Sequence, residues 1–152
     1  MIEDNQHRPI HSCMETVTIT REQLDAMCAQ HEAERAPIIA AGIEALRRLV
    51  AVAQRDSGQS KKCGRFLLSC YNGQAWPFDL TDLRGLDREL FEDCMTVLRM
   101  DRQPEVEIHQ RIEGGDAIWS RFKMDWTTRE EAERFGPEFF ADWLKLYGRD
   151  LA

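Results

Sequence analysis

Asp79 and Asp82 are the first side chains to consider, because paired carboxylates can hold Mg²⁺ or share a proton in acid–base catalysis. They stand in the string D-L-T-D-L. The same string suits a capped turn leading into a helix, in which aspartate oxygens accept from free amides and leucines enter the core. We favour the capping role, and we expect neither a metal site nor a cofactor.

The four histidines form no recognisable catalytic or metal-binding set. His7 and His11 are four residues apart in a stretch that contains proline, but two ligands do not close a metal site. His31 ends an apolar stripe, where the C-terminus of a helix favours a cation. His109 could pair with a cysteine or an aspartate, which leaves a hydrolase as the weakest alternative. Because the known catalytic motifs are missing, we expect a protein that is not an enzyme.

The cysteines are odd in number and show no C-x-x-C spacing. They are Cys13, Cys28, Cys63, Cys70 and Cys94. We expect reduced thiols that act as small apolar side chains, as is usual in the cytoplasm. Cys63 is the exception to consider, because Lys61, Lys62 and Arg65 stand beside it and nearby cations lower the pKa of a thiol.

Acidic residues gather in the second half of the chain. Residues 79–116 carry a net charge of −6, whereas residues 45–65 carry +5. Glu89, Glu92 and Asp93 share one face of a predicted helix, where like charges cost a few tenths of a kcal/mol per pair. A protein that tolerates this cost is suited to a cationic partner, so we predict an acidic partner-binding surface. Its residues are Asp79, Asp82, Asp87, Glu89, Glu92 and Asp93.

The basic stretch supports a competing prediction. Its cations could grip phosphates, which would make the protein a small nucleic-acid-associated factor acting through residues 47–65. Those cations are Arg47, Arg48, Lys61, Lys62 and Arg65. A helix that begins near Ser60 would add amide donors. The simplest alternative to both predictions is that the charges only solvate helix faces.

Helices must position most of these side chains. The string T-R-E-Q at Thr20 is a capping box, and an apolar stripe follows it until a break is expected before Pro37. Further helices are predicted over residues 37–53, from Ser60, from Asp87, and after the turn at 114–115, and a second capping box stands at residues 128–131. A C-terminal aromatic helix is expected over residues 137–148.

Two short segments carry a strand signal. Valine and isoleucine alternate with polar residues in residues 14–19, and again in residues 105–112. We favour a small two-stranded sheet made by these segments, with a short helix as the alternative for residues 105–112.

Composition sets the class of protein. The chain has 152 residues, of which 43% are hydrophobic and 31% charged, and its net charge is −7. These values predict a soluble, mainly α protein of five to seven helices, with a flexible tail over residues 1–13 and a single domain over residues 14–152. An acidic chain disfavours a broad nucleic-acid footprint. No stretch is long and apolar enough for a membrane span and no secretory signal is visible, so we expect a cytoplasmic protein.

Three strings in the middle of the chain carry a family resemblance. They are G-Q-S-K-K-C-G-R-F-L-L-S-C-Y-N at 58–72, F-D-L-T-D-L-R-G-L-D at 78–87 and D-C-M-T-V-L-R-M at 93–100. The chain resembles, over residues 43–126, an uncharacterised family of bacterial domains of unknown function, found mostly in proteobacteria and often carried on mobile genetic elements. The resemblance implies a compact helical domain and a bacterial cytoplasmic home, and it implies no activity.

Small acidic proteins of mobile elements often block host defences. Together with the acidic surface, this association predicts an inhibitor of a host defence complex, of the anti-CRISPR or anti-restriction type, that imitates nucleic acid. The protein partner would then be a CRISPR effector or another nucleic-acid-binding defence complex. The aromatic helix could also serve a homodimer through Phe139, Phe140, Trp143 and Tyr147, since aromatic residues are enriched in interfaces.

Overall fold

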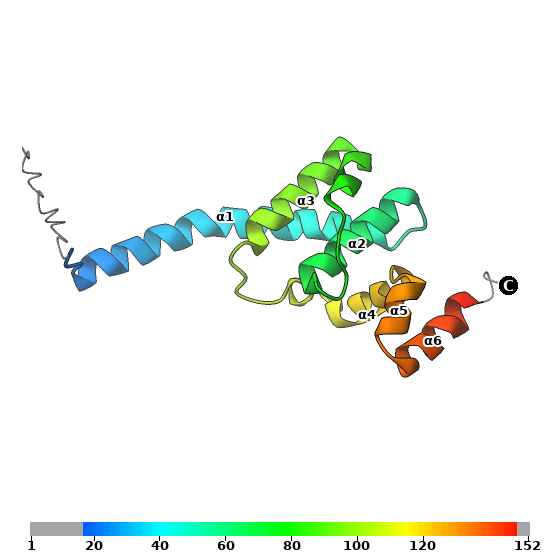
Figure 1. Ribbon diagram of the computed structural model, residues 1–152. Helices are drawn as coiled ribbons and strands as arrows, with labels where there is room; N and C mark the ends of the chain where they lie inside the picture. The colour runs from blue at the N-terminus through cyan, green and yellow to red at the C-terminus, as the bar shows by residue number, and fades with distance from the viewer. Residues whose placement is uncertain (1–16, 149–152) are drawn as a thin grey trace, which may run out of the picture. The chain divides into compact units, whose positions relative to one another are not determined.

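All regular structure in residues 17–148, which the computed structural model describes, is helical (Figure 1). In chain order the elements are α1 (Arg21–Ala53), α2 (Gly58–Asn72), the 3-10 helix η1 (Leu80–Gly85), α3 (Arg88–Asp101), the 3-10 helix η2 (Ile108–Arg111), α4 (Gly115–Asp125), α5 (Arg129–Arg134) and α6 (Pro137–Tyr147). This confirms the expected mainly α fold. The contacts between residues divide the chain after Ala33 into two units.

Helix α2 is the centre of the second unit, since it contacts η1, α3, η2 and α4. Its residues Phe66, Leu67 and Leu68 are buried. They join one apolar core with buried side chains from α1, α3, η2 and α4, among them Leu46 of α1 and Trp119 of α4. The periodic apolar residues that predicted these helices are therefore the residues that hold them together.

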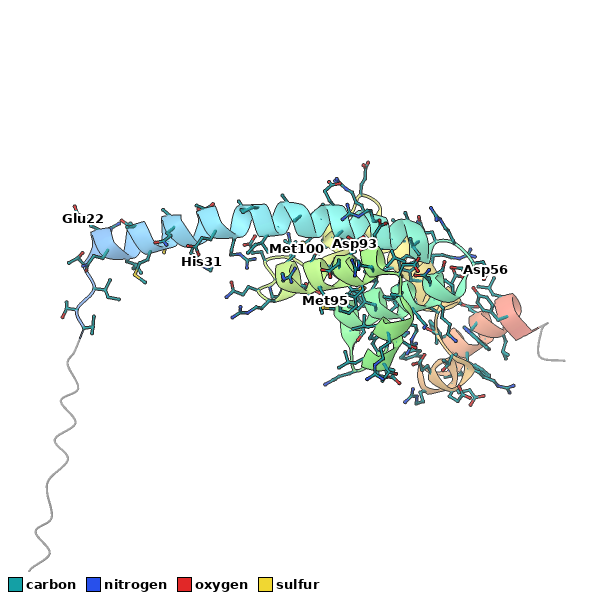
Figure 2. All side chains as sticks on the ribbon, turned by 90° about the horizontal axis from the view of Figure 1, so that it is seen from above. Glu22, His31, Asp56, Asp93, Met95 and Met100 are labelled. Atoms are coloured by element: carbon teal, nitrogen blue, oxygen red, sulfur yellow. The ribbon has the colours of Figure 1, made fainter. Side chains whose placement is uncertain are left out.

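Helices α1 and α3 approach closely where small and flexible residues meet. A Cβ atom on Gly42 would lie 2.4 Å from the Cβ atom of Met100, so only glycine fits there. Met100 and Asp93, seven residues apart on α3, both lie on the side that faces α1 (Figure 2). This contact fixes the part of α3 that carries several predicted site residues.

Helix α1 continues through Pro37, so the predicted break before that residue is wrong. Proline removes one backbone donor and costs a helix about 3 kcal/mol. The alanines on both sides favour the helix, and the residues from Ala45 to Ala53 are anchored in the core. His31 consequently lies inside a helix and does not end one.

The predicted two-stranded sheet is also wrong, because no strand occurs in the described part of the chain. Residues 17–19 have no regular structure, and residues 14–16 lie outside the described range. In the segment 105–112, the side-chain carbonyl of Gln110 accepts a hydrogen bond from the amide of Glu107 at 3.2 Å, and η2 follows. The tight turn buries Ile108 and leaves Val106 43% exposed. The alternation of apolar and polar residues in this segment therefore belongs to a capped turn and not to a strand.

Both predicted capping boxes are confirmed. At the start of α1, the Thr20 amide donates to Gln23 Oε1 at 2.9 Å and the Gln23 amide donates to Thr20 Oγ1 at 3.2 Å. At the start of α5, the Thr128 amide donates to Glu131 Oε2 at 2.9 Å and the Glu131 amide returns a bond to Thr128 Oγ1. Each box satisfies two amides that the first turn of a helix leaves free.

The predicted C-terminal aromatic helix corresponds to α6. Trp143 is buried, and the ring of Phe139 packs edge-on against Phe135 at 5.3 Å between centroids. Phe135 in turn packs at a tilt against Trp76, and the Tyr147 hydroxyl donates to Asp125 Oδ1. Many of these aromatic side chains therefore pack against other parts of the same chain.

Candidate functional site

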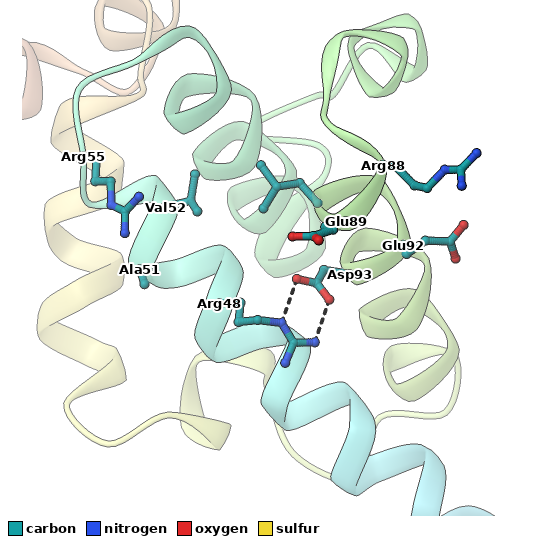
Figure 3. Close-up of a pocket in the computed structure, with 9 residues that line it drawn as sticks. Arg48, Ala51, Val52, Arg55, Arg88, Glu89, Glu92 and Asp93 are labelled. Carbon is teal, nitrogen blue, oxygen red and sulfur yellow. Dashed lines mark hydrogen bonds and ion pairs between the residues drawn. The ribbon is translucent and has the colours of Figure 1, made fainter.

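A groove of about 570 Å³ between α1 and the first turns of α3 brings together four of the predicted site residues (Figure 3). We call it the α1–α3 groove. It is lined by Arg48, Ala51, Val52, Arg55, Arg88, Glu89, Leu90, Glu92 and Asp93. The three apolar side chains among them, Ala51, Val52 and Leu90, form the floor of the groove. None of the three is fully buried.

Arg48 and Asp93 form a bidentate ion pair at one end of this groove. The Arg48 Nε and Nη2 atoms donate to the two Asp93 carboxylate oxygens at 3.0 and 2.7 Å. Asp93 is 7% exposed, and its hydrogen bond with Arg48 raises the pKa of the guanidinium. A buried carboxylate needs such a partner. Asp93, predicted for the acidic surface, thus neutralises Arg48, predicted for the basic one.

Glu89 and Glu92 remain open to solvent at the rim of the groove. Neither forms an ion pair within residues 17–148. Glu89 lies close to the Arg48–Asp93 pair, while the side chains of Arg88 and Glu92 point away from it (Figure 3). Glu89 lies in the first turn of α3, where a negative charge interacts favourably with the helix dipole and offsets part of the repulsion from Glu92.

Two of the other predicted acidic residues, Asp79 and Asp87, accept hydrogen bonds from within the chain. Asp79 caps η1, and its Oδ1 atom accepts from the amide and the hydroxyl of Thr81 at 2.8 and 2.7 Å. These bonds, the hydroxyl first, lower the pKa of Asp79. The Asp87 carboxylate accepts from Gln59 Nε2 at 2.7 Å instead of capping α3. The predicted cap at Asp79 is therefore confirmed, whereas Asp87 occupies the N-cap position of α3 without a side-chain capping bond.

The predicted basic residues do not form one surface. Arg47 pairs with Glu44, and Arg48 pairs with Asp93. Lys61 and Lys62 line a second hollow of about 370 Å³. We call it the α2–η1 hollow; its lining also includes Arg65, Asp79 and Asp82. Acids and bases that are separate in the sequence thus face one hollow together.

Arg65 holds the most enclosed ion pair of the described chain. Its Nη1 and Nη2 atoms donate to the two carboxylate oxygens of Glu131 at 2.6 and 2.7 Å. The side chains are 12% and 6% exposed, and Arg65 also donates to the carbonyls of Trp126 and Pro77. Arg65 therefore links α2 to α5 and to the loop before it, and it is not available to phosphate.

Cys63 is fully buried, and burial raises the pKa of its thiol to about 11, with the Asp93 charge as a second cause. This shift is opposite to the one that the neighbouring cations suggested. Burial is also the main cause that raises the pKa of the Cys70 and Cys94 thiols. Cys28 is exposed. The hypothesis of a reactive Cys63 is not supported, because a buried thiol ionises and reacts poorly.

His109 packs among aromatic rings and not beside a nucleophile. Its ring lies 5.2 Å from that of Tyr71, and its Nε2 atom is 3.2 Å from Asp116 Oδ1. Among residues 17–148, no three His, Cys, Asp or Glu side chains are close enough to hold a metal ion. His7 and His11 lie outside the described residues.

Sequence reasoning missed several residues of the α1–α3 groove, namely Ala51, Val52, Arg55, Arg88 and Leu90. A usable signal was present, because Arg48, Val52 and Arg55 stand at i, i+4 and i+7 and must share one face of α1. What the spacing could not give is the helix that faces them.

No helix within residues 17–148 has the length and apolar character that crossing a bilayer requires.

The fold around α2 defines a helical domain without a sheet in its described part, and its grooves are lined by charges of both signs. The chain belongs to a family of unknown function, DUF7673, whose sequence profile matches residues 43–127. The matched range begins in the core half of α1 and ends just after α4. No curated protein and no solved structure matches the chain significantly.

Proposed function

We propose that the protein is a non-enzymatic binding protein that engages a cationic partner at the α1–α3 groove. The observation that carries this proposal is the pair of exposed carboxylates that line the groove, Glu89 and Glu92, beside the apolar side chains of its floor. Carboxylates beside an apolar floor suit a partner segment that carries both lysine or arginine and apolar side chains. The acidic surface is narrower than the sequence predicts, because three of its six residues have partners within the chain.

The finer form of the proposal names the partner. We infer that the protein inhibits a bacterial host-defence complex, of the anti-CRISPR or anti-restriction type, by occupying a groove that otherwise holds nucleic acid. The excess of acidic residues, with a net charge of −7, supports this inference, since it favours fast association with a cationic groove. A bacterial cytoplasmic home and carriage on a mobile genetic element belong to the same proposal.

The nucleic-acid alternative is less well supported. Of its five predicted cations, Arg47, Arg48 and Arg65 each pair with a carboxylate of the chain. Lys61 and Lys62 remain, and the hollow that they line also contains two aspartates. Phosphate contacts require unneutralised cations, so we favour the protein partner.

The test measures both capture and inhibition. The tagged full-length protein is passed through lysates of bacteria with active CRISPR or restriction systems at low and high salt, and each captured complex is then assayed for DNA cleavage with and without the protein. We expect a salt-sensitive defence complex whose cleavage the protein inhibits. The double variant Glu89→Lys with Glu92→Lys should abolish both effects.

The matched control is Glu113→Lys with Glu130→Lys. These two glutamates are also exposed, and their reversal changes the net charge by the same amount. It should leave inhibition nearly intact if the groove is the site. Equal losses in both variants would show that total charge and not the groove drives binding, and capture of nucleic acid alone would favour the accessory-factor alternative.

A further inference from the structure

The first turns of α1 carry apolar side chains that nothing in the described chain covers. Leu24 is 52% exposed, Met27 is 57% exposed, and Cys28 is exposed as well. With His31 they stand at i, i+3, i+4 and i+7, which places them on one face of the helix. We call Leu24, Met27, Cys28 and His31 the α1 stripe.

The α1 stripe is not needed to make its own helix. The capping box at Thr20 closes the first turn, and Ala26, Ala29 and Ala33 are strong helix formers. The stripe also lies before residue 43, where the family match begins, so it is not part of the domain that the family shares. Large exposed apolar side chains set in a row on one face of a helix are typical of a docking face.

The charges beside the stripe show which occupant fits. Residues 17–33 hold three acidic residues and one arginine, a net charge of −2. Asp25 and Glu32 are seven residues apart, so they lie along one edge of the stripe, and Arg21, four residues before Asp25, stands at the start of that edge. Glu22 lies on the side opposite His31, as a separation of nine residues requires (Figure 2). Asp25 and Glu32 form no ion pair within the described part of the chain.

A second copy of this chain fits less well than a basic helix. Antiparallel pairing of two stripes would place the acidic edges together, and parallel pairing would set them against Gln23 and Gln30, which carry no positive charge. A helix with lysine or arginine beside its apolar face would instead meet both the apolar row and its acidic edge. We propose that the α1 stripe is the docking face for a basic amphipathic helix of a partner protein. The proposal goes beyond the α1–α3 groove and does not depend on it.

The probe is a fluorescent synthetic helix with leucines along one face and lysines at its edges, titrated into the full-length protein at physiological salt. Anisotropy gives its Kd. In Leu24→Ser with Met27→Ser the Kd should rise roughly tenfold or more, since two apolar contacts are lost. The matched control is Leu80→Ser with Leu146→Ser, because these leucines are 74% and 55% exposed elsewhere on the chain. The control should bind as the wild type does.

A charge reversal distinguishes docking at the α1 stripe from non-specific electrostatic attraction. Asp25→Lys with Glu32→Lys should weaken binding of the lysine probe and restore binding to a probe with glutamates in place of its lysines. Reversing Glu113 and Glu130, which are exposed outside α1, should not restore it. All substituted side chains are exposed, so circular dichroism should show unchanged helicity in every variant.

Three results would overturn the proposal. One is a Kd that the stripe variant leaves unchanged. Another is a dimer in sedimentation that the stripe variant dissociates, because a second copy would then be the occupant. The last is protection of Cys28 from maleimide in the free protein, mapped by peptide mass spectrometry, because the chain's own residues would then cover the stripe.

Discussion

At the scale of single residues, the ion pairs join charged residues that are far apart in the sequence. Arg48 and Asp93 are 45 residues apart, and Arg65 and Glu131 are 66 residues apart. Each pair joins one residue of the basic stretch to a distant carboxylate and neutralises both charges. A buried charge requires a partner, and only the folded chain selects which one it receives.

The buried thiols give a prediction at this scale. Cys63 and Cys94 are fully buried, and burial raises the pKa of both thiols, so neither ionises near neutral pH. With a maleimide reagent, Cys28 should react quickly in the native protein, whereas Cys63 and Cys94 should react only after a denaturant unfolds it. Peptide mass spectrometry distinguishes the sites. Rapid labelling of Cys63 in the native state would contradict its burial.

The Arg65–Glu131 pair gives a prediction of pH dependence. Burial alone raises the pKa of Glu131, but hydrogen bonds from Arg65 and Thr128 outweigh it and hold the pKa below its ordinary value of 4.5. A carboxyl with a lowered pKa stabilises the fold above its unfolded-state pKa, and that contribution is lost as the pH falls through the folded-state pKa. Glu131→Gln should therefore cost about 2–3 kcal/mol in the free energy of unfolding at pH 7.

The cost should shrink as the pH falls below about 4.5, because the wild type then loses the same charge. Denaturant unfolding of both proteins across this pH range measures it. The matched control is Glu133→Gln, which removes a half-exposed glutamate from the same helix and should change stability by less than about 1 kcal/mol. A cost of Glu131→Gln that is independent of pH would contradict the ion pair.

At the scale of the elements, apolar periodicity and capping strings predicted the helices well. The capping boxes at Thr20 and Thr128 and the cap at Asp79 are local features, so a few adjacent residues are enough to specify them. The errors arose where a local rule met longer-range packing. Pro37 did not end α1, and the alternation around Ile108 gave a 3-10 turn whose apolar residue reaches the core.

Glycine substitutions in α2 test how tightly this helix packs. A Cβ atom at Gly64 would lie 2.2 Å from the indole Cδ1 atom of Trp126, whose Nε1 donates to the Ala53 carbonyl. Gly64→Ala should therefore destabilise the fold by about 1–3 kcal/mol. Gly58 is the control in the same helix, since a Cβ atom there meets nothing within 4 Å. Gly58→Ala should change stability by less than about 1 kcal/mol.

Denaturant unfolding followed by circular dichroism measures both changes. Equal effects of the two substitutions would contradict the close contact between α2 and Trp126, because only the alanine at position 64 would meet the indole ring.

At the scale of the whole molecule, the contacts divide the chain after Ala33. The fully packed core begins at Ala45, the partly buried side chains that pack against it begin at Ile39, and residues 21–33 have exposed side chains. Deleting residues 1–33 should therefore change stability by less than about 1 kcal/mol, a shift in Tm of roughly 4 °C or less. Deleting residues from Pro137 onward removes the buried Trp143 and should lower Tm by more. A large loss of stability in the first deletion would contradict the division.

The sequence by itself determined the helical class, the capped helix starts, the acidic excess and membership of a family, because each of these depends on composition or on residues that are close in the chain. It identified four of the nine residues that line the α1–α3 groove. It could not show that Arg48 and Asp93 neutralise each other or that Lys61 and Asp82 line one hollow.

Only the tertiary structure decided which charges remain open, which thiols are buried and which apolar stripe joins the core. The stripe at Leu24 and the stripe at Leu46 look alike as patterns, yet Leu24 is 52% exposed and Leu46 is fully buried. The physical reason is that burial and pairing depend on what packs against a residue. In this chain the packing partners of the site are dozens of residues away along the sequence, beyond the reach of helical spacing.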